Sequence, residues 1–148
     1  MDELIIHAQV SVLRFTSELA SQFRAKFNMP FETVNFDSHK NEDDLPSANV
    51  VGLESFSYME RDDPVAVISG QITVGTSQDP DNDILIRALS MVIKKTKALA
   101  TIPLLNSQTG EVIGEIIFDG YRAVPPSSMG EAKIYQSVIF DGNILLNR

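Results

Sequence analysis

The stretch at residues 65–99 constrains the fold most, because it predicts a strand, a tight turn and a helix in direct succession. Within residues 65–76, apolar residues and glycines alternate with polar ones, which is typical of a strand buried on one face. Asp79 and Pro80 then follow as an expected helix N-cap and first helical residue. We expect the helix to reach Leu99, because its last turn carries the lysines that suit the negative end of a helix dipole.

The residues before this stretch predict a helix and a second strand. Apolar residues recur every three or four positions from Asp2 to Phe27, which predicts one long helix with a single apolar stripe. The strand at 49–59 changes the side on which its apolar residues lie, which indicates a bulge near Glu54 or Ser55. The expected elements in chain order are a helix at 2–27, a short strand at 33–36, an acidic loop at 37–48 and a strand at 49–59 that forms an antiparallel hairpin with 65–76.

The residues after the stretch predict a second hairpin and one long strand. Gly110 is expected in a left-handed turn between two apolar runs. The expected elements are strands at 100–105 and 111–119, a loop at 124–130 that 120–122 lead into, a strand at 132–141, and a turn at Asp141 and Gly142 before the last residues. The whole pattern predicts an α+β fold in one domain of 148 residues: one mostly antiparallel sheet, two helices packed on one face, and two β-hairpins.

Composition excludes several classes of function. The chain contains no cysteine, which removes disulfides, thiol nucleophiles and cysteine metal sites. Its net charge of −8 argues against a surface that grips nucleic acid phosphates. No apolar run approaches the roughly 20 residues of a membrane span. Asp2 and Glu3 stand where a secretory signal would carry Lys or Arg, so we expect synthesis and assembly in a cytoplasm.

Two clusters of side chains resemble catalytic or metal sites, and neither is convincing. Asp79, Asp81 and Asp83 have the spacing that opens a calcium loop, but Ile84 and Ser90 occupy the positions that need Gly and a bidentate Glu. A helix cap explains these acids better. The acids around His39 belong to a solvated loop, which holds ligands poorly. We therefore expect no catalytic residue, no metal and no cofactor.

Two apolar features point to assembly instead. The helix between Ile84 and Ile93 is apolar on nearly all sides, so either the first helix or a neighbouring subunit covers its other face. At the chain end, three apolar residues follow the expected turn and need a partner surface, or else form an edge strand of the same sheet. The resulting candidate interface residues are Ile86, Met91, Ile144, Leu145 and Leu146.

The order of elements resembles the tail-terminator, or tail-completion, proteins of long-tailed bacteriophages, and the likeness runs through most of the chain. The features that carry it are the opening helix, the acidic loop that closes on Asp44, Leu45 and Pro46 before the strand at Val50 and Val51, the strand at 68–74, the acidic turn into the helix, and Gly120, Tyr121 and Arg122 before the last strand at 132–140.

This resemblance implies a structural protein without catalysis. It implies a homohexameric ring that caps the completed tail tube, halts its polymerisation and presents a surface to the neck or head-tail connector. DNA would pass through the ring without specific binding, which suits an acidic protein. Two alternatives remain: another tail, neck or baseplate protein of the same fold, or a small-molecule binding domain or enzyme in which the His39 loop closes over a pocket.

Much of the negative charge lies in one loop and one turn between Asp37 and Asp63. The simplest interpretation is a solvated surface. The alternative that we favour is that at least one of the two segments faces the channel of the ring or the end of the tube. The candidate residues are Asp43, Asp44, Glu60, Asp62 and Asp63.

Overall fold

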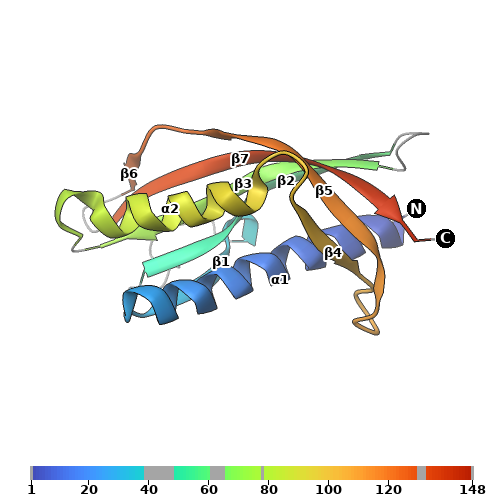
Figure 1. The fold of residues 1–148 in the computed structure, drawn as a ribbon, viewed down its shortest axis with the longest axis horizontal. Helices are drawn as coiled ribbons and strands as arrows, with labels where there is room; N and C mark the ends of the chain where they lie inside the picture. The colour runs from blue at the N-terminus through green and yellow to red at the C-terminus, as the bar shows by residue number, and fades with distance from the viewer. Residues whose placement is uncertain (1, 39–48, 61–65, 78, 130–132, 148) are drawn as a thin grey trace.

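The computed structural model describes the chain except for residues 1, 39–48, 61–65, 78, 130–132 and 148. The described residues form an α+β fold, in which two α-helices lie against one β-sheet (Figure 1). In chain order the elements are α1 Asp2–Phe27, β1 Phe31–Asn35, the 3-10 helix η1 Phe36–Ser38, β2 Asn49–Glu60, β3 Ala66–Thr76, the 3-10 helix η3 Pro80–Asn82, α2 Asp83–Thr96, β4 Thr101–Leu105, β5 Val112–Ala123, β6 Ser127–Met129 and β7 Lys133–Leu146.

The strands form a single sheet in the order β1-β2-β3-β7-β5-β4, with β6 paired to β7. Every neighbouring pair is antiparallel except β1 and β2, which run parallel. The two predicted hairpins are present as β2–β3 and β4–β5, so the predicted α+β class with a mostly antiparallel sheet is confirmed. The parallel pairing of β1 is not predicted by the sequence, because a short strand carries no local signal for its direction.

The sheet curls into a half-barrel, and its concave side holds both helices (Figure 1). α1 packs against β1, β2 and β4, whereas α2 packs against β3, β5 and β7. Because β1 and β4 are the two ends of the strand order, α1 bridges the two edges of the curled sheet. We call the side that faces the helices the concave face and the other side the convex face.

Aromatic rings fill much of the space between the helices and the concave face. The ring centroids of Phe15 and Phe118 are 5.9 Å apart, and those of Phe118 and Phe140 are 5.6 Å apart. Phe23 meets Phe31 edge-on at 5.1 Å. The apolar stripe predicted for the first helix faces this core, with its members buried except for two half-buried residues at its ends. The stripe consists of Ile5, Ala8, Val12, Phe15, Leu19, Phe23 and Phe27.

Polar side chains of α1 bind the backbone of both edge strands. Ser11 Oγ accepts a hydrogen bond of 2.8 Å from the backbone N–H of Leu105 on β4. At the other edge, the Arg24 guanidinium donates a hydrogen bond of 2.7 Å to the carbonyl oxygen of Phe31 on β1. Pro103 further weakens β4 as a pairing partner, because proline has no backbone N–H. Both edges are thereby partly blocked against strand addition by another chain.

The predicted bulge in β2 is confirmed and has a specific partner. The register between β2 and β3 shifts between Glu54 and Ser57, and Ser55 has a positive φ of 56°. The Asp37 carboxylate accepts hydrogen bonds from the backbone N–H groups of Ser55 at 2.8 Å and Phe56 at 3.2 Å. Asp37 therefore stabilises a distortion in the neighbouring strand.

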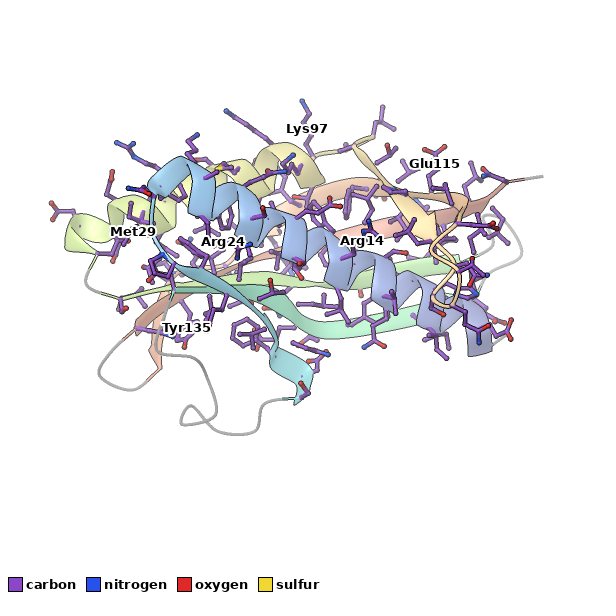
Figure 2. All side chains as sticks on the ribbon, turned by 90° about the horizontal axis from the view of Figure 1, so that it is seen from below. Arg14, Arg24, Met29, Lys97, Glu115 and Tyr135 are labelled. Carbon is purple, nitrogen blue, oxygen red and sulfur yellow. The ribbon has the colours of Figure 1, made fainter. Side chains whose placement is uncertain are left out.

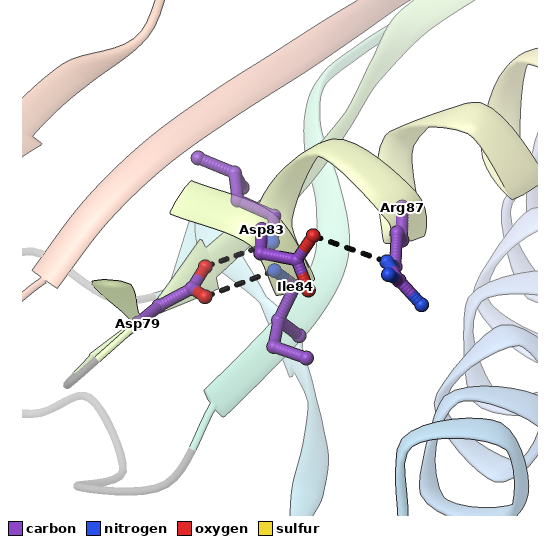
Figure 3. Close-up of polar contacts among 5 residues, drawn as sticks. Asp79, Asp83, Ile84 and Arg87 are labelled. Atoms are coloured by element: carbon purple, nitrogen blue, oxygen red, sulfur yellow. Dashed lines mark hydrogen bonds and ion pairs between the residues drawn. The ribbon is translucent and has the colours of Figure 1, made fainter. Parts of the chain in front are cut away.

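The Asp79 carboxylate caps α2, as Figure 3 shows. Its two oxygens accept hydrogen bonds of 2.9 Å from the backbone N–H groups of Ile84 and Leu85. The hydroxyl of Thr76, at the end of β3, donates a third bond of 3.1 Å to the same carboxylate. This side chain thus joins the strand to the helix and satisfies two N–H groups that the helix itself leaves free.

The predicted bounds of this helix are wrong at both ends. It begins at Asp83 and not directly after Asp79, because Asp81 and Asn82 adopt left-handed φ values of 58° and 55°. It ends at Thr96 and not at Leu99, because Lys97 is already extended. The Asp79 side chain reaches over the intervening 3-10 turn, so its capping role is confirmed although its position relative to the helix is not.

The predicted turn at Asp141 and Gly142 is also wrong, because β7 runs without interruption from Lys133 to Leu146. Gly142 pairs with Ile68 on one side and Phe118 on the other. A Cβ atom at Gly142 would lie 3.0 Å from the side chain of Ile116, so the glycine makes room for its neighbours within the sheet. Its absence of a side chain serves packing and not chain reversal.

The predicted end of β5 at Asp119 is also wrong. The strand continues to Ala123 through a bulge between Phe118 and Tyr121. Gly120 has a φ of 106° in this bulge, a backbone conformation that a residue with a side chain rarely adopts. The glycine therefore lets the strand continue past the irregularity.

Candidate interaction surface

The convex face of the sheet is the broadest candidate surface. Side chains alternate between the two faces along a strand, so the residues between the buried core positions point to the convex face. On β3 these include Ser69, Gln71 and Thr73, because Ile68, Gly70 and Ile72 are buried against the helices. Within the described residues, both helices lie on the opposite face (Figure 1).

An apolar row crosses the convex face near the C-terminal end of β7. Met59, Val67, Asn143 and Ile117 are successive Cα partners across β2, β3, β7 and β5, so their side chains stand next to one another. Met59 is 60% exposed, and Leu145, two residues after Asn143, is 46% exposed. We call Met59, Val67, Ile117 and Leu145 the apolar row. Neighbouring exposed apolar side chains are typical of a surface that binds a partner.

The middle of the convex face carries polar side chains that bind one another. The Thr73 hydroxyl donates a hydrogen bond of 2.9 Å to the Glu54 carboxylate and lies 2.7 Å from the hydroxyl of Ser137. The hydroxyls of Ser57 and Ser69 are 2.6 Å apart. These bonds hold the side chains of three adjacent strands in place, and because Thr73 and Ser137 are buried, they stabilise the sheet and are not open to a partner.

A groove of about 290 Å³ lies on the convex face where β5 bulges. One of the residues that line it, Asp141, lies two positions before Asn143 on β7, so the groove is next to the apolar row. Its volume is at the lower limit of sites for small molecules, which suits a protein side chain better than a cofactor. We call it the bulge groove, and its lining residues are Asp119, Gly120, Tyr121, Arg122, Ile139 and Asp141.

The other end of the convex face is closed by a second, smaller hydrophobic cluster. Val34, Val50 and Tyr135 are buried there, and Phe36 of η1 packs on them. The rings of Phe36 and Tyr135 meet edge-on with centroids 6.1 Å apart. Tyr135 is therefore a core residue. The apolar row is the apolar part of the convex face that is exposed.

The two candidate interface residues on α2 differ in exposure. Ile86 is 58% exposed and stays a candidate. Met91 is half-buried and packs against the main core, together with Ile84 and Ile93. Most of the apolar surface that the sequence predicts for this helix is therefore covered within the same chain, and Ile86 is the part that remains outside.

Of the three candidates at the chain end, Ile144 is wrong as a docking residue. It has no exposed surface, and its Cα partners are Ala66 on β3 and Ile116 on β5. Leu146 is half-buried against the same core, so only Leu145 is exposed to a partner. The alternative, a strand of the same sheet, is correct, although the segment lies between two strands and not at an edge. Removal of residues 143–148 is therefore expected to unfold the chain.

The acidic candidates are only partly within the described residues. Asp43, Asp44, Asp62 and Asp63 lie outside them. Glu60 is exposed at the end of β2, where it accepts a hydrogen bond of 3.5 Å from the Tyr58 hydroxyl. Burial raises the pKa of Tyr58, and the negative charge of Glu60 raises it further.

His7 on α1, and Asp79 and Asp83 of the calcium-like cluster, have structural partners. His7 Nδ1 accepts a hydrogen bond of 2.9 Å from the backbone N–H of Ser107, which ties α1 to the β4–β5 turn. Asp79 caps α2, and Asp83 forms an ion pair of 3.1 Å with Arg87 (Figure 3). Among the described residues, no group of three or more His, Asp or Glu side chains is arranged to hold a metal ion.

The parts of this surface that the sequence analysis missed are the bulge groove and three members of the apolar row, Met59, Val67 and Ile117. A usable signal exists for the row, because Val67 and Ile117 are apolar residues at positions that alternate with core residues. The groove depends on the bulge at Gly120, and its position follows only from the register of β5 against β7.

Comparison with models of known protein families and with curated proteins found no match to this chain. No helix in the described part of the chain is long and apolar enough to cross a membrane. The function is therefore inferred from the surface of the molecule and from the order of its elements.

Proposed function

We propose that this chain is a structural protein of a long-tailed bacteriophage, which forms a ring on the completed tail tube, ends tube polymerisation and provides the joining surface to the head connector. The proposal follows from the order of elements described above, which resembles tail-terminator proteins. The partners that it implies are further copies of the same chain, the tail tube protein and a neck or head-tail connector protein.

The observation that carries the proposal is the exposed apolar row on the convex face. A ring subunit needs a firm surface that remains exposed in the monomer and is covered on assembly. The exposure of Met59 and Leu145 provides apolar contact area. Hydrogen bonds among Glu54, Thr73 and Ser137 hold β2, β3 and β7 in place, the strands on which most of the row lies. Both edge strands are bound by α1, which favours assembly through faces over assembly through added strands.

The net charge supports the same function. A ring at the end of a tail tube surrounds a path for DNA, and a wall of net negative charge lets the phosphate backbone pass without binding it. We propose that the acidic segments that contain Asp43, Asp44, Glu60, Asp62 and Asp63 face this channel or the end of the tube.

A related structural role is the alternative. A tube, neck or baseplate protein would use the same broad face, because fold alone does not determine which surface a partner covers. A small-molecule function receives less support, since the bulge groove is small and lies open on a sheet face.

Electron microscopy of virus particles made without this protein separates these roles. Loss of a terminator is expected to give tails of irregular and excessive length, and supplying the wild-type chain should restore uniform tails. Loss of a tube protein would abolish tails, and loss of a neck protein would leave tails of normal length that fail to join heads. Either of the last two results contradicts the proposed role.

A further inference from the structure

Positive charge in the described chain is concentrated on the helical side. Of the nine Lys and Arg residues in the described part, seven lie on α1, on α2 or directly after α2. The whole chain nevertheless has a net charge of −8. On α1 these cations are matched by Asp2, Glu3 and Glu18, so the excess of positive charge lies on α2 and directly after it.

The end of α2 carries the densest part of this charge. Lys94, Lys95 and Lys97 are all exposed, and we call them the lysine patch. Ion pairs on the described helices use Arg14 and Arg87, so within the described residues the lysine patch has no ion-pair partner. Figure 2 shows the Lys97 side chain extending away from the body of the molecule. Two exposed apolar residues accompany the patch: Ile86, 58% exposed, and Leu99, 82% exposed.

The bulge groove has the complementary chemistry. Asp119 and Asp141 supply two exposed carboxylates, and Ile139 supplies an aliphatic wall. Arg122 is the one cation among the lining residues, so carboxylates outnumber cations there. A lysine side chain has the matching form, with an apolar stem and a charged end.

We propose that the lysine patch of one copy of the chain binds the bulge groove of a second copy. In this contact the lysine stems lie against Ile139, and their ammonium groups pair with Asp119 and Asp141. The apolar row beside the groove then meets the exposed Ile86 or Leu99 of the second copy. A second copy is the occupant because one chain carries both halves of the complementary pair.

The two halves lie on opposite sides of the same strands. α2 packs on the concave side of β5 and β7, and the groove opens on their convex side. In a head-to-tail contact, each copy that binds leaves one free lysine patch and one free groove. Such head-to-tail contacts produce rings when the rotation closes. The inference rests on the ring of the proposed function and identifies the contact within it.

A charge-exchange experiment tests this contact with the protein alone. One variant carries K94E, K95E and K97E, and the other carries D119K and D141K. Sedimentation velocity over increasing protein concentration should show that each variant associates at least about tenfold more weakly than the wild-type chain, because like charges then face each other. An equal mixture of the two variants should regain association, since the acidic helix end of one fits the basic groove of the other.

All substituted residues are exposed, so circular dichroism and thermal unfolding should match the wild-type protein and show that weakened association is not a folding defect. Association of the mixture at wild-type strength supports the contact. A mixture that remains as weak as its separate components overturns it, as does a lysine variant that associates like the wild-type chain.

Cross-linking gives a second, independent measurement. Because the chain contains no cysteine, single K97C and D119C variants each carry one defined thiol. A short bifunctional thiol reagent should join K97C to D119C several times faster than it joins K97C to S17C, which places the thiol on an exposed part of α1. Equal rates for the two pairs, or a wild-type chain that stays monomeric at every concentration, overturn the inference. The tail-length experiment is unaffected by either result, so the two proposals can fail separately.

Discussion

The concave and convex faces of the sheet use the same strands for different purposes. On the concave face, side chains such as Phe118 and Phe140 are almost completely buried against the helices. On the convex face, Thr73 and Ser137 bind each other, and Met59 and Leu145 are exposed. Successive residues of one strand therefore contribute to two unrelated properties, the stability of the subunit and the character of its exposed surface.

This difference is sharpest in β7, which lies in the middle of the sheet. Ile144 is completely buried between β3 and β5, while its neighbour Leu145 is 46% exposed on the other face. Two residues of similar size and hydrophobicity thus occupy opposite environments. Substitutions on the two faces are expected to separate folding from association.

The largest expected effect is that of Ile144→Ala. Removal of buried methyl groups leaves a cavity, so the free energy of unfolding should fall by about 2–5 kcal/mol. The matched control is Leu145→Ala, which should change that free energy by no more than about 0.5 kcal/mol. Urea unfolding followed by circular dichroism measures both. Equal losses in the free energy of unfolding for the two variants would show that Ile144 and Leu145 do not lie on opposite faces of the sheet.

The sequence predicts elements where local pattern and long-range packing agree. Alternation in β3 and the periodicity of α1 are strong because each buries one face against a single layer. The bulge in β2 is also predictable, since apolar residues there change sides. Each of these signals is contained within one segment.

The prediction fails where a glycine has a role that depends on distant residues. Gly142 has no side chain because Ile116 occupies that space, and Gly120 allows a bulge within a continuing strand. Local pattern predicts a turn at Gly142 and the end of a strand just before Gly120. The bulge groove depends on these two strands, so it could not be located from the sequence, whereas the alternation along β3 and β5 contains a signal for the apolar row. Leu145 and Ile86, which the sequence selects as interface candidates, are exposed.

A medium effect is expected at Asp79, which determines how α2 is placed on the concave face. Asp79→Ala removes the acceptor for two backbone N–H groups and should lower the free energy of unfolding by about 1–2 kcal/mol. Asp83→Ala is the control, because it removes only an exposed ion pair with Arg87 worth about 0.3–0.5 kcal/mol. Thermal unfolding of the two variants measures the difference, and a larger loss for Asp83→Ala would refute the capping role of Asp79.

The smallest expected effect on stability, and the most informative about function, is that of Met59→Ser combined with Leu145→Ser. Both side chains are largely exposed on the convex face, so each substitution should change the free energy of unfolding by no more than about 0.5 kcal/mol. Association between copies should nevertheless weaken, because the apolar row loses its two most exposed members. Val112→Ser is the matched control, since Val112 is 57% exposed at the start of β5 and does not belong to the row. Sedimentation velocity at equal concentrations compares the two proteins. If the double variant and the Val112 variant associate equally well, the apolar row is an ordinary exposed surface and the contact between copies lies elsewhere.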